Sequence, residues 1–192
     1  MDVNELKKRI VIAAYRAGEG HIASAFSILD ILYVLHTQIL GPDDRFILSK
    51  GHASLAYYAA LGLAFDDFCG YDSLFGGHPD RNKVPGVLAS TGSLGHGFPI
   101  AVGVALARKI KGSPGRIYCL VGDGECNEGS IWEASLLAAH HKLDNLCLIV
   151  DHNHSNDRAI DLGNLTNKFS AFDFVVTRGS GHDHRKIGRA HV

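Results

Sequence analysis

The sequence predicts an open α/β fold, in which helices cover both faces of a mostly parallel sheet. Two short runs of apolar residues, 117–121 and 146–150, have the continuous hydrophobic character of strands that are buried on both faces. A helical pattern over 130–141 lies between them, and a strand, a helix and a strand in that order form a parallel crossover. A hydrophobic fraction of 46% and a charged fraction of 20% are typical of a globular chain with its own core.

The remaining elements follow from the spacing of apolar residues and from the residues that end helices. Apolar residues recur at helical spacing before Gly18 and again before Gly41-Pro42, and both positions are helix stops. The other helices expected from these signals cover residues 3–17, 27–39, 53–64 and 100–111. The short apolar run 45–49 is predicted as a strand. Most turn-forming residues fall in 70–91, and so long an irregular segment is usually functional.

The charge balance and the cysteine pattern exclude several classes of protein. Lys and Arg number 19 against 20 Asp and Glu, so a net charge of −1 offers no basic surface that would hold a nucleic acid. No uninterrupted apolar run reaches the roughly 18 residues of a membrane span, and the amino terminus lacks the pattern of a signal peptide. We therefore expect a cytoplasmic protein without a membrane segment. The 4 cysteines have no C-x-x-C spacing, and we expect neither a zinc site nor a disulfide.

Polar residues follow both strands of the predicted crossover at the point where each strand ends. Gly122-Asp123-Gly124 comes directly after the first strand, and Asn153 follows the second. Because ligands of open α/β sheets bind beyond the carboxyl ends of the strands, we expect these groups to share one crevice. Their oxygens suit Mg²⁺ or Ca²⁺, and the amino end of the helix over 130–141 favours a phosphate group. Gly-Asp-Gly on its own is also an ordinary turn, so the motif alone leaves both interpretations open.

The wider sequence resembles a known family through five motifs in register. Residues 122–153 read GDGECNEGSIWEASLLAAHHKLDNLCLIVDHN and resemble the thiamine diphosphate motif, in which Gly-Asp-Gly is followed at a distance by Asn. Upstream stand GEGHIAS, LSKGHAS, GGHPD and STGSLGHG, in the order found in transketolases. From residue 1 to about residue 183 the chain is similar to the transketolase family, and it looks most like the amino-terminal subunit of split transketolases.

The resemblance implies a site for thiamine diphosphate and a divalent cation, Mg²⁺ or Ca²⁺. Asp123, Asn153 and the backbone carbonyl of Ser155 match the metal ligands of the family. The residues that match contacts with the cofactor are His52, Gly92, Ser93, Leu94, Gly122, Asp123, Gly124, Glu125 and Asn153. After Asn153 the chain departs from the usual family sequence. We expect the carbonyl ligand to survive this change, because every residue has one, whereas the loop that closes over the diphosphate is expected to differ.

Three histidines and two glutamates match catalytic positions of the family. His21 and His78 match residues that contact the hydroxyl groups of the sugar and handle protons, and His52 matches a histidine near the diphosphate and the thiazolium ring. Glu128 and Glu133 match a path of carboxylates that links the two active sites of a dimer. Acidic residues at the start of a helix are equally expected from the helix dipole alone, so both interpretations stay open for these two.

The limits of the resemblance set the expected domain boundaries. Residues 1–185 are expected to form the thiamine diphosphate-binding domain, in which 174–183 resembles a family strand that ends in Gly-His-Asp. Residues 186–192 read like a translated sequencing-library adapter, and we expect a non-native or unmatched tail on a truncated gene model. A lineage-specific tail is the alternative. Amino-terminal halves in the family continue further, through another strand and another histidine that contacts substrate.

The resemblance implies a transketolase-type transferase, as in the pentose phosphate pathway, that moves a two-carbon ketol unit from a ketose phosphate to an aldose. No segment resembles the pyrimidine-binding half, so we expect a C-terminal transketolase subunit as partner and no activity of the chain alone. We expect the assembly to be a homodimer or to contain two copies of each subunit. Residues 100–107, Ile131 and Trp132 are expected at an interface. Two alternatives stay open. One is another thiamine diphosphate enzyme, like deoxyxylulose-phosphate synthase or a 2-oxoacid dehydrogenase, and the other is a truncated, non-catalytic cofactor-binding or scaffold domain.

Overall fold

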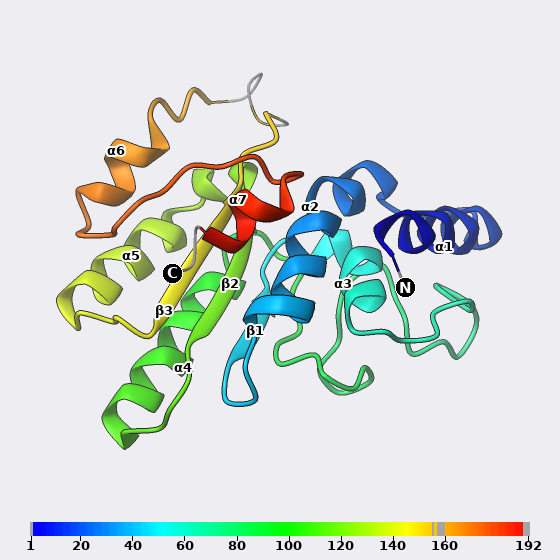
Figure 1. Ribbon diagram of the computed structural model, residues 1–192, viewed down its shortest axis with the longest axis horizontal. Coiled ribbons are helices and arrows are strands. Elements are labelled where there is room, and N and C mark those ends of the chain that lie inside the picture. Colours follow the sequence, from blue (N-terminus) through cyan, green and yellow to red (C-terminus); the bar gives the residue numbers. More distant parts are fainter. Residues whose placement is uncertain (1, 155, 157–159, 190–192) are drawn as a thin grey trace.

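The computed structural model describes residues 2–154, 156 and 160–189, which form one sheet and the helices around it (Figure 1). The strands are β1 (Arg45–Leu48), β2 (Ile117–Gly122) and β3 (Leu146–Asp151). The helices are α1 (Val3–Ala17), α2 (Ile22–Val34), α3 (Ser54–Ala60), α4 (Gly97–Lys111), α5 (Gly129–His140), α6 (Leu165–Ser170) and α7 (His184–Arg189). Shorter helical turns cover Leu35–Ile39, Gly51–Ala53 and Asp123–Asn127.

The three strands form a parallel sheet in the order β1-β2-β3, which confirms the predicted open α/β fold. Phe46 lies opposite Tyr118, and Tyr118 lies opposite Cys147, so the strands run level with one another. Successive side chains of a strand point to opposite faces. Tyr118 accordingly joins the core beneath α1, α2 and α3, while Cys119 joins the core beneath α4 and α5. The two groups of helices lie on opposite sides of the sheet in Figure 1.

α1 begins and ends where the sequence predicts. Asp2 caps its first turn, because Asp2 Oδ1 accepts a hydrogen bond from Glu5 N at 2.8 Å, and Gly18 ends it with a left-handed φ of 69°. α3 is shorter than predicted and ends at Ala60 rather than at residue 64. The segment 70–91 contains no helix or strand, as its turn-forming residues predict.

α2 begins at Ile22, earlier than the start predicted at residue 27, and a π-helical turn extends it to Ile39. Its buried residues lie around most of its circumference: Ala25, Ile28, Leu29, Asp30, Ile31, Leu32 and Val34. A helix buried on several sides shows no polar stripe, so the period that locates a helix was weak here. By length and composition alone, the 18 residues Ile22–Ile39, with mean hydropathy 1.5, could cross a membrane, although polar residues interrupt the apolar ones within this stretch.

The segment 174–183, expected as a strand, is not one in the structure. Phe174 and Val176 pack on the core beneath α4 and α5, and Val175 between them is 97% exposed, so side chains alternate as they do in a strand. However, the segment pairs with no strand in the described part of the chain. Because a strand is defined by the backbone ladder it makes with a neighbour, alternation alone leaves this segment as extended chain.

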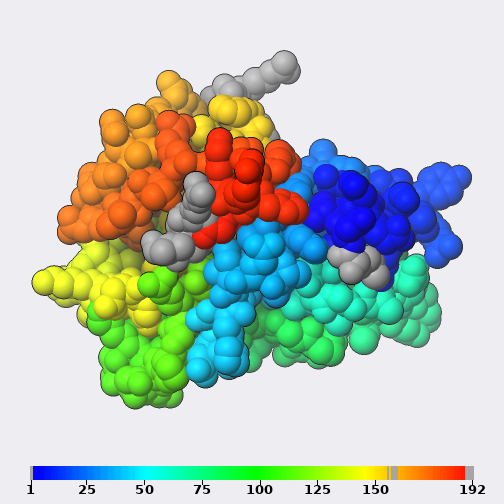
Figure 2. Space-filling model, in the orientation of Figure 1, coloured from blue at the N-terminus to red at the C-terminus, as the bar shows by residue number. Residues whose placement is uncertain are grey.

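The helix α7 packs against α2 and closes one side of the core. Ile187 is buried there, and Asp30 of α2 is hydrogen bonded to His182 Nδ1 at 3.0 Å and to His184 Nε2 at 2.8 Å. Figure 2 shows this carboxyl-terminal segment lying against the amino-terminal helices on the visible face. The domain boundary predicted after residue 185 falls inside α7 and stays a prediction.

Candidate functional site

Polar residues meet at the carboxyl edge of the sheet. β2 ends at Gly122 and β3 ends at Asp151, and these two residues face each other in the parallel ladder. Asp123 and Asn153, the predicted metal ligands, therefore follow neighbouring strands that end at the same level. The segment 49–52, which follows β1, reaches the same edge. The fold thus brings together residues that stand far apart in the sequence.

Asp123 and Asn153 are both oriented by neighbouring polar groups. Asp123 is 2% exposed, and its Oδ1 accepts a hydrogen bond from Gly124 N at 2.9 Å. The amide nitrogen of Asn153 donates to Asp151 Oδ2 at 2.9 Å. A buried carboxylate and an oriented amide that follow neighbouring strands supply the hard oxygen donors that Mg²⁺ prefers, so these residues fit a divalent cation that also takes phosphate oxygens. Ser155, the third predicted ligand, lies outside the described residues.

A buried ion pair adjoins these groups. Lys50 Nζ lies 2.7 Å from Asp151 Oδ2, and the two side chains are 3% and 8% exposed. Ser27 Oγ donates to the same carboxylate, 2.7 Å from Oδ2, which helps to satisfy a charge that would otherwise be costly to bury. We did not predict Ser27, Lys50 or Asp151 from the sequence. The available signal was the lysine inside the LSKGHAS motif, which follows an apolar strand directly.

Glu125 joins three of the sequence motifs from inside the protein. Its Oε1 accepts hydrogen bonds from Ser49 Oγ at 2.6 Å and from Gly95 N at 3.0 Å, and its Oε2 accepts one from Gly122 N at 2.9 Å. Glu125 is 1% exposed, and burial raises its pKa against the opposing effect of these hydrogen bonds. Protein groups engage both oxygens, so this glutamate bears on the predicted cofactor site through the loops it holds.

The loop after β1 and the loop before α4 touch backbone to backbone. A Cβ on Gly51 would lie 2.8 Å from Gly92 N and 2.8 Å from the carbonyl group of Thr91. Gly92 has a φ of +156°, and a Cβ there would lie 2.8 Å from the His78 ring. Only glycine leaves room for these contacts. They hold the predicted cofactor loop, 92–94, against the segment 49–52 that follows β1.

The three predicted catalytic histidines lie close together. His21 and His78 line a cavity of about 320 Å³, whose other lining residues are Glu19, Gly20, Phe68 and Gly77. The ring of His52 meets that of His21 edge to face, with centroids 5.4 Å apart. Burial lowers the pKa of His52 to about 4, the electrostatic influence of Lys50, His21 and His78 acts in the same direction, and Asp151 opposes them. His52 is therefore a neutral hydrogen-bonding group near pH 7.

The remaining predicted site residues lie at the surface around these loops. Ser93 and Leu94 are exposed, as are Glu128 and Glu133 at the start of α5. Glu128 occupies the N-cap position of α5 but makes no capping hydrogen bond with its side chain. A Cβ on Gly95 would lie 2.6 Å from the Cβ of Glu128, so this end of α5 packs tightly on the loop before α4. The roles predicted for both glutamates stay predictions.

Two residues expected at an interface pack inside the chain. Ile131 is fully buried in the core beneath α4 and α5, so its prediction is wrong. Trp132 stacks on Phe169 of α6, with ring centroids 5.1 Å apart, and its Nε1 donates to the carbonyl oxygen of Cys126 at 2.9 Å. The large apolar residues that α4 and α5 expose are Ile100, Ile110, Leu136 and Leu137.

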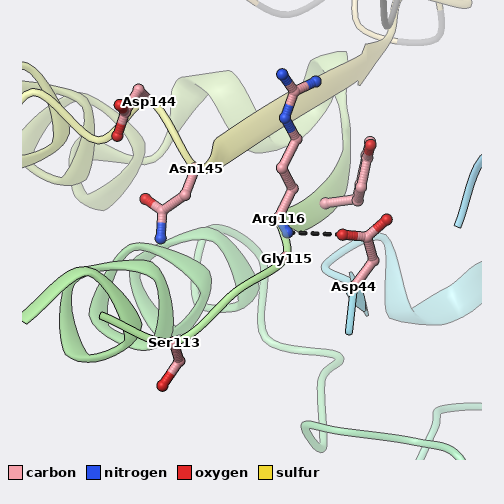
Figure 3. Close-up of a pocket in the computed structure, with 7 residues that line it drawn as sticks. Asp44, Ser113, Gly115, Arg116, Asp144 and Asn145 are labelled. Atoms are coloured by element: carbon pink, nitrogen blue, oxygen red, sulfur yellow. Dashed lines mark hydrogen bonds between the residues drawn. The ribbon is translucent and has the colours of Figure 1, made fainter. Parts of the chain in front are cut away.

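A second cavity, of about 560 Å³, lies at the opposite edge of the sheet (Figure 3). Its lining residues are Asp44, Ser113, Gly115, Arg116, Tyr118, Asp144 and Asn145. Asp44, Arg116 and Asn145 stand immediately before the three strands, and Arg116 N donates to Asp44 Oδ1 at 2.7 Å. Ligands of open α/β sheets bind at the carboxyl edge, so the candidate site is the one around Asp123 and the histidines.

Comparison with protein families matches residues 3–191 to the family described as "Transketolase, thiamine diphosphate binding domain". An apulose-4-phosphate transketolase subunit from Actinobacillus succinogenes is 38% identical over 202 residues, which cover 94% of this chain and 73% of that protein. The 6-deoxy-6-sulfo-D-fructose transketolase subunit SqwG of a Clostridium species is 33% identical over 205 residues, which cover 96% of this chain and 74% of that protein.

Among solved structures, the transketolase from Leishmania mexicana matches this fold with a TM-score of 0.84 and 28% sequence identity. The match covers 99% of this chain and 34% of that one. This chain therefore spans about a third of the length of the Leishmania protein.

Proposed function

The chain belongs to the transketolase family, as a thiamine diphosphate-binding domain, and from this membership we propose that it is the amino-terminal subunit of a two-subunit transketolase-type enzyme. In this proposal the enzyme transfers a two-carbon ketol unit from a ketose phosphate to an aldose. Two relatives named as transketolase subunits, each matched over more than nine-tenths of this chain, support the subunit role.

The observation that carries the proposal is the placement of Asp123 and Asn153 at one edge of the sheet, next to the loops that hold the histidines. Asp123, Asn153 and the carbonyl of Ser155 would hold Mg²⁺ against the diphosphate. The other proposed cofactor contacts are His52, Gly92, Ser93, Leu94, Gly122, Gly124 and Glu125. When bound, thiamine diphosphate supplies the electron sink that a carbon–carbon bond next to a carbonyl needs in order to break.

The protein's own side chains position the sugar and move protons. His21 and His78 line one cavity, and an imidazole there can take a proton from a sugar hydroxyl and return it. His52, with its pKa lowered to about 4, offers a hydrogen bond without adding a charge. Glu128 and Glu133 are proposed to carry protons between the two active sites of the assembled enzyme.

The proposal requires a C-terminal transketolase subunit, which would supply the pyrimidine-binding half of the site. The family match is to the thiamine diphosphate-binding domain, and the chain covers 34% of the Leishmania transketolase. We propose a sugar phosphate as substrate, an assembly of two copies of each subunit or a homodimer, and a cytoplasmic location.

Calorimetric titration with thiamine diphosphate and Mg²⁺ tests the site directly. Asp123→Asn removes a charged ligand, so the affinity for the cofactor should fall about tenfold or more, which corresponds to about 1.4 kcal/mol. Asp144→Asn is the matched control. Asp144 lies at the opposite edge of the sheet with a side chain that is 84% exposed, and its replacement should leave the affinity unchanged.

Each outcome of this titration decides a different point. Unchanged affinity in the Asp123→Asn chain would remove Asp123 from the site, and no metal-dependent binding in the presence of the C-terminal subunit would contradict the proposed function and favour a non-catalytic scaffold. In the presence of the C-terminal subunit, ketol transfer from a ketose phosphate supports a transketolase, whereas consumption of pyruvate would identify another enzyme with the same cofactor.

A further inference from the structure

The amide group of Asn153 is held by hydrogen bonds that reach from β3 to α2. Its Nδ2 donates to Asp151 Oδ2 at 2.9 Å and to Ser27 Oγ at 3.3 Å. Ser27 Oγ lies 2.9 and 2.7 Å from the two carboxylate oxygens of Asp151 and donates to them. A hydroxyl group has one proton and two lone pairs. Ser27 can therefore serve Asp151 as a donor and Asn153 as an acceptor at the same time.

The Asp151 carboxylate is the acceptor at the centre of this group. Lys50 Nζ donates to it at 2.7 Å, in addition to Ser27 and Asn153, and Asp151 is 7% exposed. Lys50 compensates the buried negative charge, and its Nζ also donates to the carbonyl oxygen of Ser24 at 3.4 Å. Because its oxygens face protein donors, Asp151 orients its neighbours from inside the site.

We propose that Ser27 and Asp151 are positioning residues, which fix the Asn153 amide with its nitrogen toward them and its oxygen toward the metal ion. The inference rests on the proposed function, which assigns Asn153 to the metal. A half-turn of an amide exchanges its oxygen and nitrogen, and only the oxygen binds a divalent cation. In this structure a half-turn would place the amide oxygen against the Asp151 carboxylate, where two acceptors repel each other. The hydrogen bonds therefore select the ligating orientation.

In metal sites generally, replacing a residue that orients a metal ligand lowers metal affinity by about 10- to 100-fold, and we expect an effect of this size for Ser27 and Asp151. Ser27 is the better of the two residues to replace, because it is uncharged and half-buried. Loss of its hydroxyl removes one of the two acceptors of the Asn153 amide and one donor to Asp151, and leaves the Lys50–Asp151 ion pair in place.

The experiment is a titration of Mn²⁺ into the full chain assembled with its C-terminal subunit and excess thiamine diphosphate, followed by electron paramagnetic resonance. Ser27→Ala should weaken Mn²⁺ binding about tenfold, and Ser27→Thr, which keeps a hydroxyl, should restore it. Ser27→Cys keeps the shape of the side chain with a somewhat larger atom that forms only weak hydrogen bonds, so it should behave as the alanine variant does. Ser135→Ala is the matched control, because Ser135 is a buried serine of α5 whose hydroxyl donates to the carbonyl oxygen of Ile131. It should leave Mn²⁺ affinity unchanged.

A double substitution separates positioning from a general loss of structure. In a chain that already carries Asn153→Ala, adding Ser27→Ala should cause no further loss of Mn²⁺ affinity, because the group that Ser27 orients is gone. The inference would be overturned if Ser27→Ala lowered Mn²⁺ affinity equally with and without Asn153→Ala. It would also be overturned if the Ser27→Ala and Ser27→Cys chains kept wild-type affinity. If the unaltered chain, assembled with its C-terminal subunit, binds no Mn²⁺ with the cofactor, the proposed function fails instead, so the two failures are distinguishable.

Discussion

Histidine side chains in this molecule differ in what surrounds each imidazole. His21 and His78 face the cavity near the carboxyl edge of the sheet. His141 follows the last residue of α5, which runs from the end of β2 back to the start of β3 and so ends at the opposite edge. His36 is enclosed by the rings of Phe46 and Tyr57, with centroids 5.5 and 6.0 Å away. We therefore expect His21 and His78 to affect turnover, His141 to have no effect on it, and His36 to affect stability.

Replacing the cavity histidines should affect turnover and little else. In the enzyme assembled with its partner, His21→Ala or His78→Ala should lower the turnover of ketol transfer by about 100-fold, the scale of a lost proton-transfer group. His141→Ala should leave turnover unchanged, since its side chain is remote from the cavity. The measurement is the steady-state rate with a ketose phosphate donor. Equal effects at all three positions would remove His21 and His78 from the reaction.

The buried His36 should make the folded state less stable in acid. Burial lowers its pKa from 6.5 to about 4, so the unfolded chain binds more protons between those two pH values. Stability is then lost as pH falls through that window, on the order of 1 kcal/mol between pH 7 and pH 5. His36→Leu should reduce the difference in urea unfolding free energy between pH 7 and pH 5. The pKa of His52 is also lowered, so part of the dependence of the unfolding free energy on pH should remain. If the variant shows the same difference in unfolding free energy between pH 7 and pH 5 as the unaltered chain, His36 does not cause the loss of stability in acid.

At the scale of elements, the close contact between two loops gives a sharp test. Gly51→Ala places a methyl group 2.8 Å from the backbone at Thr91 and Gly92, so the loops must separate. We expect the unfolding free energy to fall by about 1–3 kcal/mol and cofactor affinity to fall with it. In the control Gly103→Ala, the new methyl meets nothing within 4 Å on α4, and helix propensity should raise stability by about 0.5–1 kcal/mol. Urea unfolding measures the stability of the two variants, and the same change in unfolding free energy for Gly51→Ala and Gly103→Ala would contradict the steric explanation.

Elements with one buried side or an uninterrupted apolar run could be predicted from the sequence. α1 has a single apolar face between Asp2 and Gly18, and β2 is buried over its whole length. The start of α2 could not, because a helix packed on several sides loses the contrast that a periodicity argument needs. The segment 174–183 shows the converse, since its side chains alternate but its backbone has no partner strand in the described chain.

The candidate site divides in the same way. Asp123 and Asn153 could be predicted because each follows an apolar strand, and the histidines because the short motifs around them resemble those of the transketolase family. Ser27 and Lys50 were missed. Ser27 is 124 residues from Asp151, and Lys50 is 101 residues from it, so their hydrogen bonds exist only after α2 has packed on the sheet and β1 and β3 have both paired with β2. No local pattern carries that information.

For the whole molecule, the expectation is that the chain is inactive without a partner. It holds the proposed diphosphate and metal half of the site, and α4 and α5 expose Ile100, Leu136 and Leu137. We predict that the purified chain shows no ketol transfer, self-associates through apolar surface, and gains activity when a C-terminal subunit is supplied. Assays of transfer from a ketose phosphate, with light scattering for the oligomeric state, check this. Turnover clearly above background by the chain alone would contradict it.

The position of Glu125 also has a consequence for the order of events in folding. Its hydrogen bonds join it to Ser49, 76 residues away, and to Gly95, 30 residues away. We expect the contact with Ser49 to form after the parallel ladder between β1 and β2, because that ladder brings Ser49 next to the segment that carries Glu125. Interactions absent from the folding transition state act on the unfolding rate. Glu125 should therefore slow the opening of the folded protein while contributing little to the speed at which the chain first folds.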